Sequence, residues 1–259
     1  ATLDHYGPIV RNVKDAALML DVIAGPHDSD RFTIPRKISS YLDALNELPK
    51  NLKIGYSTKL GFVRAINPEV KDTVETAAKK FEDYDWLVEE VKVKIKKPEL
   101  AFNTLVTSGL AYDFESLLKD ESKLDDTLIK MIQAGLSYSA IDVKRAENGR
   151  ENLYEVVYKH FKDYDILITP TTACPPFGLG MMYPPKIAGK AVSPVAWMSY
   201  TYPFNMSGNP AASIPCGWTK DGLPIGMQII GPRFEDLIVL QVSQAFEDIN
   251  PWQEKKPKL

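Results

Sequence analysis

A run of residues near the C-terminus constrains the fold most, because it predicts two strands joined by a tight turn. Residues 205–217 read NMSGNPAASIPCG, and residues 221–231 read DGLPIGMQIIG. The stretches 211–215 and 224–230 are typical of strands, and Asp221 with Gly222 between them is a pair typical of a tight reversal. This part of the chain is therefore expected to form a loop, a strand, a turn and a second strand.

The rest of the chain alternates between predicted helices and strands, which is typical of an α/β layer fold. Helices are expected over residues 13–24, 68–84, 98–118, 124–134, 139–161 and 234–249. Strands are expected over residues 52–56, 86–95 and 166–169. Residues 170–194 are rich in proline but also contain apolar residues, so we expect a long ordered loop there rather than a linker.

Composition excludes several functional classes. The chain has 259 residues, of which 44% are hydrophobic, enough for a sizeable core in one domain or part of one. Its 31 basic and 34 acidic residues give a net charge of −3, which argues against nucleic-acid binding as the main task. No apolar run approaches the roughly 20 residues of a membrane-spanning helix, so no membrane association is expected. Two cysteines, Cys174 and Cys216, cannot form a disulfide framework and favour a reducing cytoplasm.

Three segments resemble the amidase signature family, serine hydrolases that cleave carboxamides. The C-terminal run is similar to the family's N-x-x-G-x-P-A-x-S-x-P-x-G followed by G-L-P-x-G-x-Q-x-x-G. Residues 3–17, LDHYGPIVRNVKDAA, resemble its S-L-D-x-x-G-P-x-x-R-x-V-x-D-A-A stretch, and residues 164–171, YDILITPT, resemble Y-D-x-L-x-x-P-T. The matches keep the family's order. The resemblance therefore implies the family's α/β fold, a mixed central sheet flanked by helices.

The family's catalytic loop has no counterpart in this sequence. In the family, the nucleophile lies in a loop of the type G-G-S-S-G-G-S, and a Lys and a second Ser complete a Ser-Ser-Lys triad upstream of the S-L-D segment. This chain begins at ATLD. The resemblance implies that residues 1–259 are the C-terminal part of a single amidase signature domain, with the triad supplied by an upstream segment or a partner chain. We therefore expect no catalytic residue here, and no cofactor.

The resemblance also suggests substrate-binding residues. Arg150 lies fourteen residues before Tyr164, the spacing at which one family member, the A subunit of glutamyl-tRNA amidotransferase, carries an Arg that grips a carboxylate. A guanidinium can pair bidentately with such a group. The alternative is a helix-surface Arg that pairs with Glu147 or Glu151.

Met198 marks a departure from that family member, which places an Asp there for the substrate's amino group. A thioether cannot hold an ammonium by charge, so a different and more apolar amide is expected. Trp197, Tyr200 and Phe204 would line one side of its pocket together with Met198. Core packing is the alternative for these aromatic residues.

By the same resemblance, Thr171, Thr172 and Cys174 would face the catalytic centre, from a loop that follows a strand. Cys174 can also be imagined as a nucleophile, but no neighbouring His supports this, and a buried or pocket-lining thiol is favoured. Cys216 is expected in the core.

Other polar residues have simpler interpretations. Residues 27–30, HDSD, could bind a metal, but a polar turn after a helix is favoured, and the three histidines are too scattered for a metal site. Ser207 before Gly208 could be a nucleophile, but a loop hydroxyl is favoured.

Two functions follow. In the first, the chain is the C-terminal portion of an amidase and shapes the pocket for a small-molecule amide. In the second, it is an inactive truncated relative that binds a ligand or partner and needs a covering chain or a homo-oligomer, because part of its sheet would be exposed.

Overall fold

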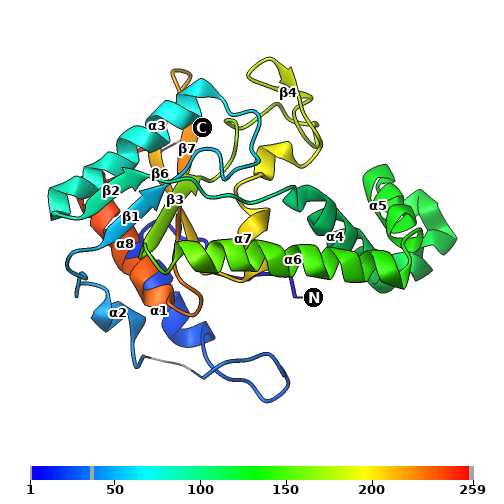
Figure 1. Ribbon diagram of the computed structural model, residues 1–259, viewed down its shortest axis with the longest axis horizontal. Coiled ribbons are helices and arrows are strands. Elements are labelled where there is room, and N and C mark those ends of the chain that lie inside the picture. The colour runs from blue at the N-terminus through cyan, green and yellow to red at the C-terminus, as the bar shows by residue number, and fades with distance from the viewer. Residues whose placement is uncertain (1, 36–37, 257–259) are drawn as a thin grey trace.

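The computed structural model describes residues 2–35 and 38–256, so both ends of the predicted 1–259 domain lie outside the described residues. Its centre is a five-stranded sheet in the order β2-β1-β3-β7-β6 (Figure 1). The strands are β1 (Lys53–Tyr56), β2 (Leu87–Glu90), β3 (Ile166–Pro170), β6 (Ala211–Trp218) and β7 (Pro224–Ile230). A separate two-stranded hairpin consists of β4 (Lys186–Ile187) and β5 (Lys190–Ala191).

Helices surround this sheet. The α-helices are α1 (Val13–Ile23), α2 (Tyr41–Ala44), α3 (Pro68–Lys79), α4 (Pro98–Phe114), α5 (Asp126–Leu136), α6 (Ala140–His160), α7 (Tyr202–Ser207) and α8 (Asp236–Ile249). Three 3₁₀ segments cover Lys80–Tyr84, Glu115–Lys123 and Ala196–Met198. No helix in the described part of the chain combines the length and the apolar content that crossing a membrane requires.

The sheet is mixed, as predicted. β1 is parallel to β2 and to β3, whereas β7 is antiparallel to both β3 and β6. The β6–β7 pair is the hairpin predicted from the C-terminal run, and Gly222 in its turn has a φ of +80°, a conformation that glycine adopts without a steric penalty. The predicted α/β fold class is therefore confirmed.

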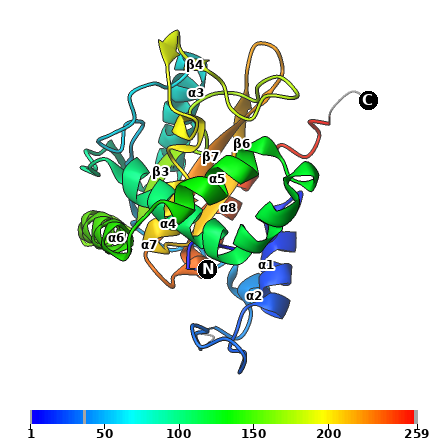
Figure 2. The same ribbon diagram turned by 90° about the vertical axis from the view of Figure 1, so that its right-hand side faces the viewer.

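Alternating side chains of β3 divide the core between the two faces of the sheet. Ile166 and Ile168 pack with residues of α3 and α8 on one face, and Leu167 packs with residues of α4, α6 and α7 on the other. All five residues of β3 are buried. In Figure 1, α4, α5 and the start of α6 extend beyond the sheet, while Figure 2 shows α6 and the α1–α2 pair on opposite sides.

Helix boundaries follow local signals where these are strong. Asn12 caps α1 by accepting a hydrogen bond from the Asp15 backbone N at 2.8 Å. Ser139 and Asp142 form a capping box at the start of α6. Pro68 stands in the first turn of α3, where its missing N–H costs nothing.

The second strand is shorter than predicted. The expected strand at 86–95 is paired only over Leu87–Glu90, because its neighbour β1 ends at Tyr56. Val91, Val93 and Ile95 beyond that point are still buried, so the apolar alternation reflects packing against the core rather than strand pairing.

Several short elements were not predicted. Tyr202–Ser207, of which the last three residues were expected in a loop, form α7, which ends where Gly208 adopts a φ of +72°. The 170–194 loop contains the small β4–β5 hairpin, and α2 covers four residues. Each is too short to give a periodic pattern.

His160 lies at the C-terminal end of α6, where it is partly buried against β1. A Cβ atom on Gly55 would lie 2.9 Å from the His160 Cε1 atom, so the glycine allows this close approach. The imidazole stacks on Tyr164 at 4.8 Å between centroids, and its Nε2 atom is buried with no hydrogen-bond partner among the described residues. Burial lowers the pKa of His160 from 6.5 to about 4, although Asp163 opposes this.

The folded state should therefore lose stability as the pH falls from 6.5 towards 4. Folding holds the neutral imidazole, so the unfolded chain binds more protons in this window, and the full effect is on the order of 3 kcal/mol. Urea unfolding of the wild type and of His160→Gln between pH 7.5 and 4 measures it. The variant should show the shallower loss, and His27→Gln, at an exposed position, is the control. Parallel profiles for wild type and His160→Gln would contradict the assignment.

Candidate active site

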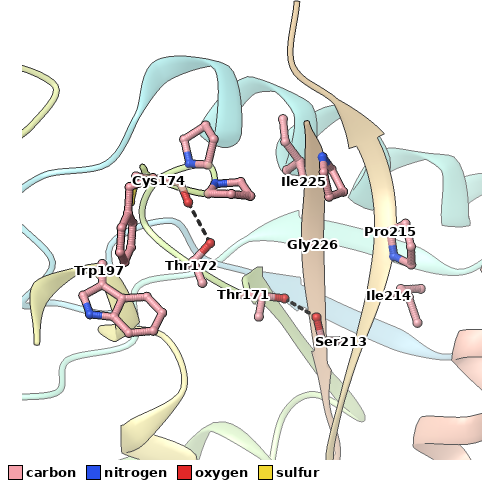
Figure 3. A pocket seen from close by; sticks show the side chains of 13 residues that line it. Thr171, Thr172, Cys174, Trp197, Ser213, Ile214, Pro215, Ile225 and Gly226 are labelled. Atoms are coloured by element: carbon pink, nitrogen blue, oxygen red, sulfur yellow. Dashed lines mark hydrogen bonds between the residues drawn. The ribbon is translucent and has the colours of Figure 1, made fainter. Parts of the chain in front are cut away.

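A cavity of about 400 Å³ lies where the loop after β3 meets the β6–β7 hairpin (Figure 3). Thr171, Thr172 and Cys174 line one side of it, and Trp197 closes it from the segment before α7. The opposite side is formed by residues 213–215 and 224–226 of the hairpin. Three segments that are distant in the sequence thus meet at one end of β3.

Backbone hydrogen bonds hold the loop after β3 in place. The Thr171 N donates to the Gly226 O at 2.9 Å, which extends the β3–β7 pairing by one residue. The Ala173 N donates to the Trp197 O at 2.9 Å, and the Ala173 O accepts from the Asn67 N at 2.8 Å. The Asn67 side chain in turn caps α3. The loop is therefore tied to β7, to the Trp197 segment and to the start of α3.

The walls of the cavity are mostly apolar. The rings of Phe177 and Trp197 meet edge to face, with centroids 5.6 Å apart and an interplanar angle of 78°. Pro175 and Pro176 continue the wall, and Ile225 faces it from β7. Aromatic side chains in this geometry attract other rings and planar groups.

Hydroxyl groups supply the polar side-chain atoms of the cavity. The Thr172 Oγ1 atom donates to the Cys174 O at 2.8 Å, a bond within the loop. The Thr171 Oγ1 and Ser213 Oγ atoms lie 2.7 Å apart across β7, and the two side chains point toward one another in Figure 3. None of the described residues that line the cavity is charged.

Cys174 is half-buried, and burial raises the pKa of its thiol above the ordinary value of 9.0. No hydrogen bond within 2–35 or 38–256 joins this thiol to a base, so the structure favours a pocket-lining thiol over a nucleophile. Cys216 is buried, as predicted, and burial raises its pKa to about 12.

The buried side-chain amide of Gln228 links the segments that form the cavity. The Gln228 Nε2 atom donates to the Thr169 Oγ1 at 3.0 Å and to the Tyr200 O at 2.7 Å. The Tyr200 hydroxyl donates to the Thr58 O at 2.7 Å. This network joins β3, β7 and the segment that carries Trp197, and buried polar groups satisfied in this way specify one arrangement of the elements they join.

Arg150 lies on α6, away from this cavity. Its Nε atom donates to the Met206 O at 2.6 Å, and its terminal nitrogens donate to the Oγ1 and O atoms of Thr2 at 2.7 and 2.9 Å. Within the described chain, the guanidinium forms an ion pair with neither Glu147 nor Glu151. Arg150 therefore joins the first residues of the chain to α6 and α7.

Met198 is half-buried and packs against the core around α6 and α7, and it does not line the cavity. Tyr200 and Phe204 are buried in the same core, which agrees with the core-packing alternative. Of the four residues proposed for this wall, the structure places Trp197 at the cavity.

The remaining polar residues have structural roles. The His27 Nδ1 atom lies 2.8 Å from the Ser29 Oγ, in a hydrogen-bonded turn. No group of three or more His, Cys, Asp or Glu residues in the described ranges could hold a metal ion. Ser207 is buried at the end of α7, where its Oγ donates to the Phe204 O.

Sequence reasoning missed Ser213, Phe177 and Gly226 as residues of this cavity. Ser213 lies within the C-terminal run, and the predicted hairpin could have placed it next to Gln228, its register partner. Its contact with Thr171 depends on β7 lying between β3 and β6, and no local pattern encodes that order.

Comparison with known proteins identifies the family to which the chain is similar. A family model described as Amidase matches residues 1–240. An acylamidase of Rhodococcus erythropolis is 33% identical over 258 residues, which cover 98% of this chain and 54% of that protein. The A subunit of the glutamyl-tRNA(Gln) amidotransferase of Halothermothrix orenii is 33% identical over 286 residues, covering 100% of this chain and 58% of that protein.

The fold agrees with solved structures. A bacterial aryl acylamidase of the amidase signature family superimposes with a TM-score of 0.88 at 30% identity, covering 97% of this chain and 55% of that one. The A subunit of the glutamyl-tRNA(Gln) amidotransferase of Thermotoga maritima gives a TM-score of 0.72 at 25% identity, with coverages of 97% and 54%. The chain thus spans about half the length of the relatives that it matches.

The two thiols should differ in reactivity. With iodoacetamide at pH 8 under native conditions, we expect slow alkylation of Cys174 and none of Cys216, because burial disfavours both thiolates and access to Cys216 is blocked. Peptide mapping by mass spectrometry over time measures this, and the unfolded protein is the control, in which both thiols should react. Alkylation of native Cys174 faster than in the unfolded protein would indicate an activated nucleophile.

Proposed function

Because the chain belongs to the amidase family, we propose that it is the C-terminal part of a single amidase signature domain that hydrolyses a small-molecule carboxamide. The observation that supports this proposal is the cavity at the end of β3, which Thr171, Thr172 and Cys174 line. The Ser-Ser-Lys triad would come from a segment outside these 259 residues, on the same polypeptide or on a partner chain.

The chemistry is acyl transfer. The serine Oγ attacks the amide carbonyl, the amine or ammonia leaves with a proton, and water then hydrolyses the acyl ester to regenerate the serine. Such a nucleophile needs an adjacent base and donors for the oxyanion. None of the described residues that line the cavity is a base of that kind, so this chain's part is to shape and position the substrate.

An exposed apolar groove beside β6 supports the proposal that another segment covers this side of the sheet. β6 is an outer strand of the sheet, and a groove of about 580 Å³ runs beside it, lined by residues 7–13, residues 210–215 and part of α8. Ile9 is 99% exposed in this groove, and the neighbouring Val10 is 37% exposed. Exposed apolar side chains along a strand edge are typical of an interface. The two free cysteines fit a reducing cytoplasm as its location.

Two residues outside the cavity, Arg150 and Met198, also bear on the substrate by the family resemblance. The names of the two relatives, an acylamidase and a glutamyl-tRNA(Gln) amidotransferase subunit, imply different amide substrates. Met198 carries no charge for a substrate ammonium, which favours an apolar amide. Arg150 would bind a substrate carboxylate by exchanging its Thr2 contacts for it.

The exposed groove is also compatible with a second function. An inactive relative that binds a ligand or partner would need the same surface covered, by another protein or by a second copy of the chain. It would lack amide hydrolysis in every assembly.

The natively purified protein should contain more than this chain. We expect a denatured mass above 29.0 kDa or a second polypeptide that co-purifies, together with release of an amine from simple anilides or amides. Intact mass, native mass and an amide-hydrolysis screen provide the test. A lone 29.0 kDa chain, or a homo-oligomer of it, without hydrolysis would favour the inactive relative.

Arg150→Ala should lower the preference for carboxylate-bearing amides over neutral ones by roughly tens-fold, because a paired carboxylate would lose its partner. The ratio of kcat/KM for an acidic amide and its neutral counterpart in the active assembly measures this. Arg145→Ala, on the same helix and paired with Asp142, is the matched control. An unchanged ratio would show that Arg150 serves only to hold Thr2 and the end of α7.

A further inference from the structure

We propose that the cavity at the end of β3 binds an uncharged aromatic group of the substrate, and that the Thr171–Ser213 hydroxyl pair hydrogen-bonds to a polar atom next to that group. The inference rests on the proposed function, because it names the substrate class of the same site. Ser213 then becomes a specificity-determining residue in addition to the residues predicted from the sequence.

The walls favour a planar ring. Phe177 and Trp197 already meet edge to face, and a ligand ring can extend that arrangement. An apolar cavity of about 150 Å³ is enough to hold benzene. The present cavity, of about 400 Å³, therefore has room for a ring and for the group that links it to the reacting carbonyl.

The absence of charge among the described lining residues favours a neutral group. An ionised carboxylate or ammonium would lose water on entering the apolar part of the cavity and would find no opposite charge there. The cavity should therefore discriminate against charged aromatic compounds of the same size.

The hydroxyl pair provides a defined polar contact. At 2.7 Å, one hydroxyl donates to the other, so the pair keeps one O–H that can be donated and lone pairs that can accept. Within the described residues these two oxygens make no other hydrogen bond, so both capacities are open to a ligand. A carbonyl oxygen or an amide N–H next to the ring would suit them.

Gly226 makes room for the pair. A Cβ atom at this position would lie 2.8 Å from the Thr171 Oγ1 and 3.1 Å from the Ser213 Oγ. The φ of Gly226 is not in the left-handed region, so the backbone there can accept an alanine. The added methyl group would only occupy the space beside the two hydroxyls. Gly226→Ala should displace the two hydroxyls while leaving both residues in place.

Binding to the natively purified protein, with any chain that co-purifies, tests the inference. Calorimetry measures the Kd of benzamide, cyclohexanecarboxamide and benzoate. We expect benzamide to bind about two- to tenfold tighter than the cyclohexyl compound, because the ring contacts add to the apolar burial, and benzoate to bind at least tenfold more weakly than benzamide.

Variants locate the binding site. The double variant Thr171→Val with Ser213→Ala should weaken benzamide binding by about two- to tenfold, and Gly226→Ala should do the same. Trp197→Leu should remove the preference for benzamide over cyclohexanecarboxamide. The matched control is Thr76→Val with Ser108→Ala, two hydroxyls that donate to carbonyls of their own helices and do not line the cavity. Thermal melts confirm that each variant is folded.

Equal affinity for the three compounds, no binding of benzamide, or an unchanged Kd in the Thr171–Ser213 double variant would each overturn the inference. Its failure is separable from failure of the proposed function. Amide hydrolysis without any dependence on these variants would remove only the aromatic subsite. Aromatic binding without hydrolysis in any assembly would leave the subsite and remove the amidase proposal.

Discussion

Strand β3 holds the structure together, because it is buried along its whole length and pairs with a parallel neighbour on one side and an antiparallel neighbour on the other. Its side chains supply both hydrophobic layers, Ile166 and Ile168 to one and Leu167 to the other. Its carboxyl end opens into the loop that forms the cavity. The strands β1 and β7 and the helix α3 contact this five-residue segment directly.

Much of the fold could be predicted from the sequence because the relevant signals are local. Asn12 and Ser139 mark helix starts through side-chain hydrogen bonds to the first turn of each helix. The Asp221–Gly222 pair marks a turn through backbone conformation. The length of β2 could not be predicted in this way, because it is set by where β1 ends, a property of a different segment.

The candidate site was predictable in part for the same reason. Thr171, Thr172 and Cys174 were proposed from the family resemblance, and their place after a buried strand supports this, because loops at strand ends commonly carry binding residues. Ser213 and Gly226 join them only through the strand order, which depends on long-range pairing. Arg150 and Met198 were proposed from resemblance, and the hydrogen bonds of Arg150 go to Thr2 and Met206, which lie far away in the sequence.

The cavity loop is held chiefly by backbone atoms: the amides of Thr171 and Ala173, the Ala173 carbonyl and the Asn67 amide. Every residue except proline offers that amide. Substitutions at Thr171, Thr172 or Cys174 can therefore alter the chemical lining of the cavity while the loop keeps its course. During divergence, this arrangement would let related chains acquire new amide preferences by single substitutions at little cost in stability.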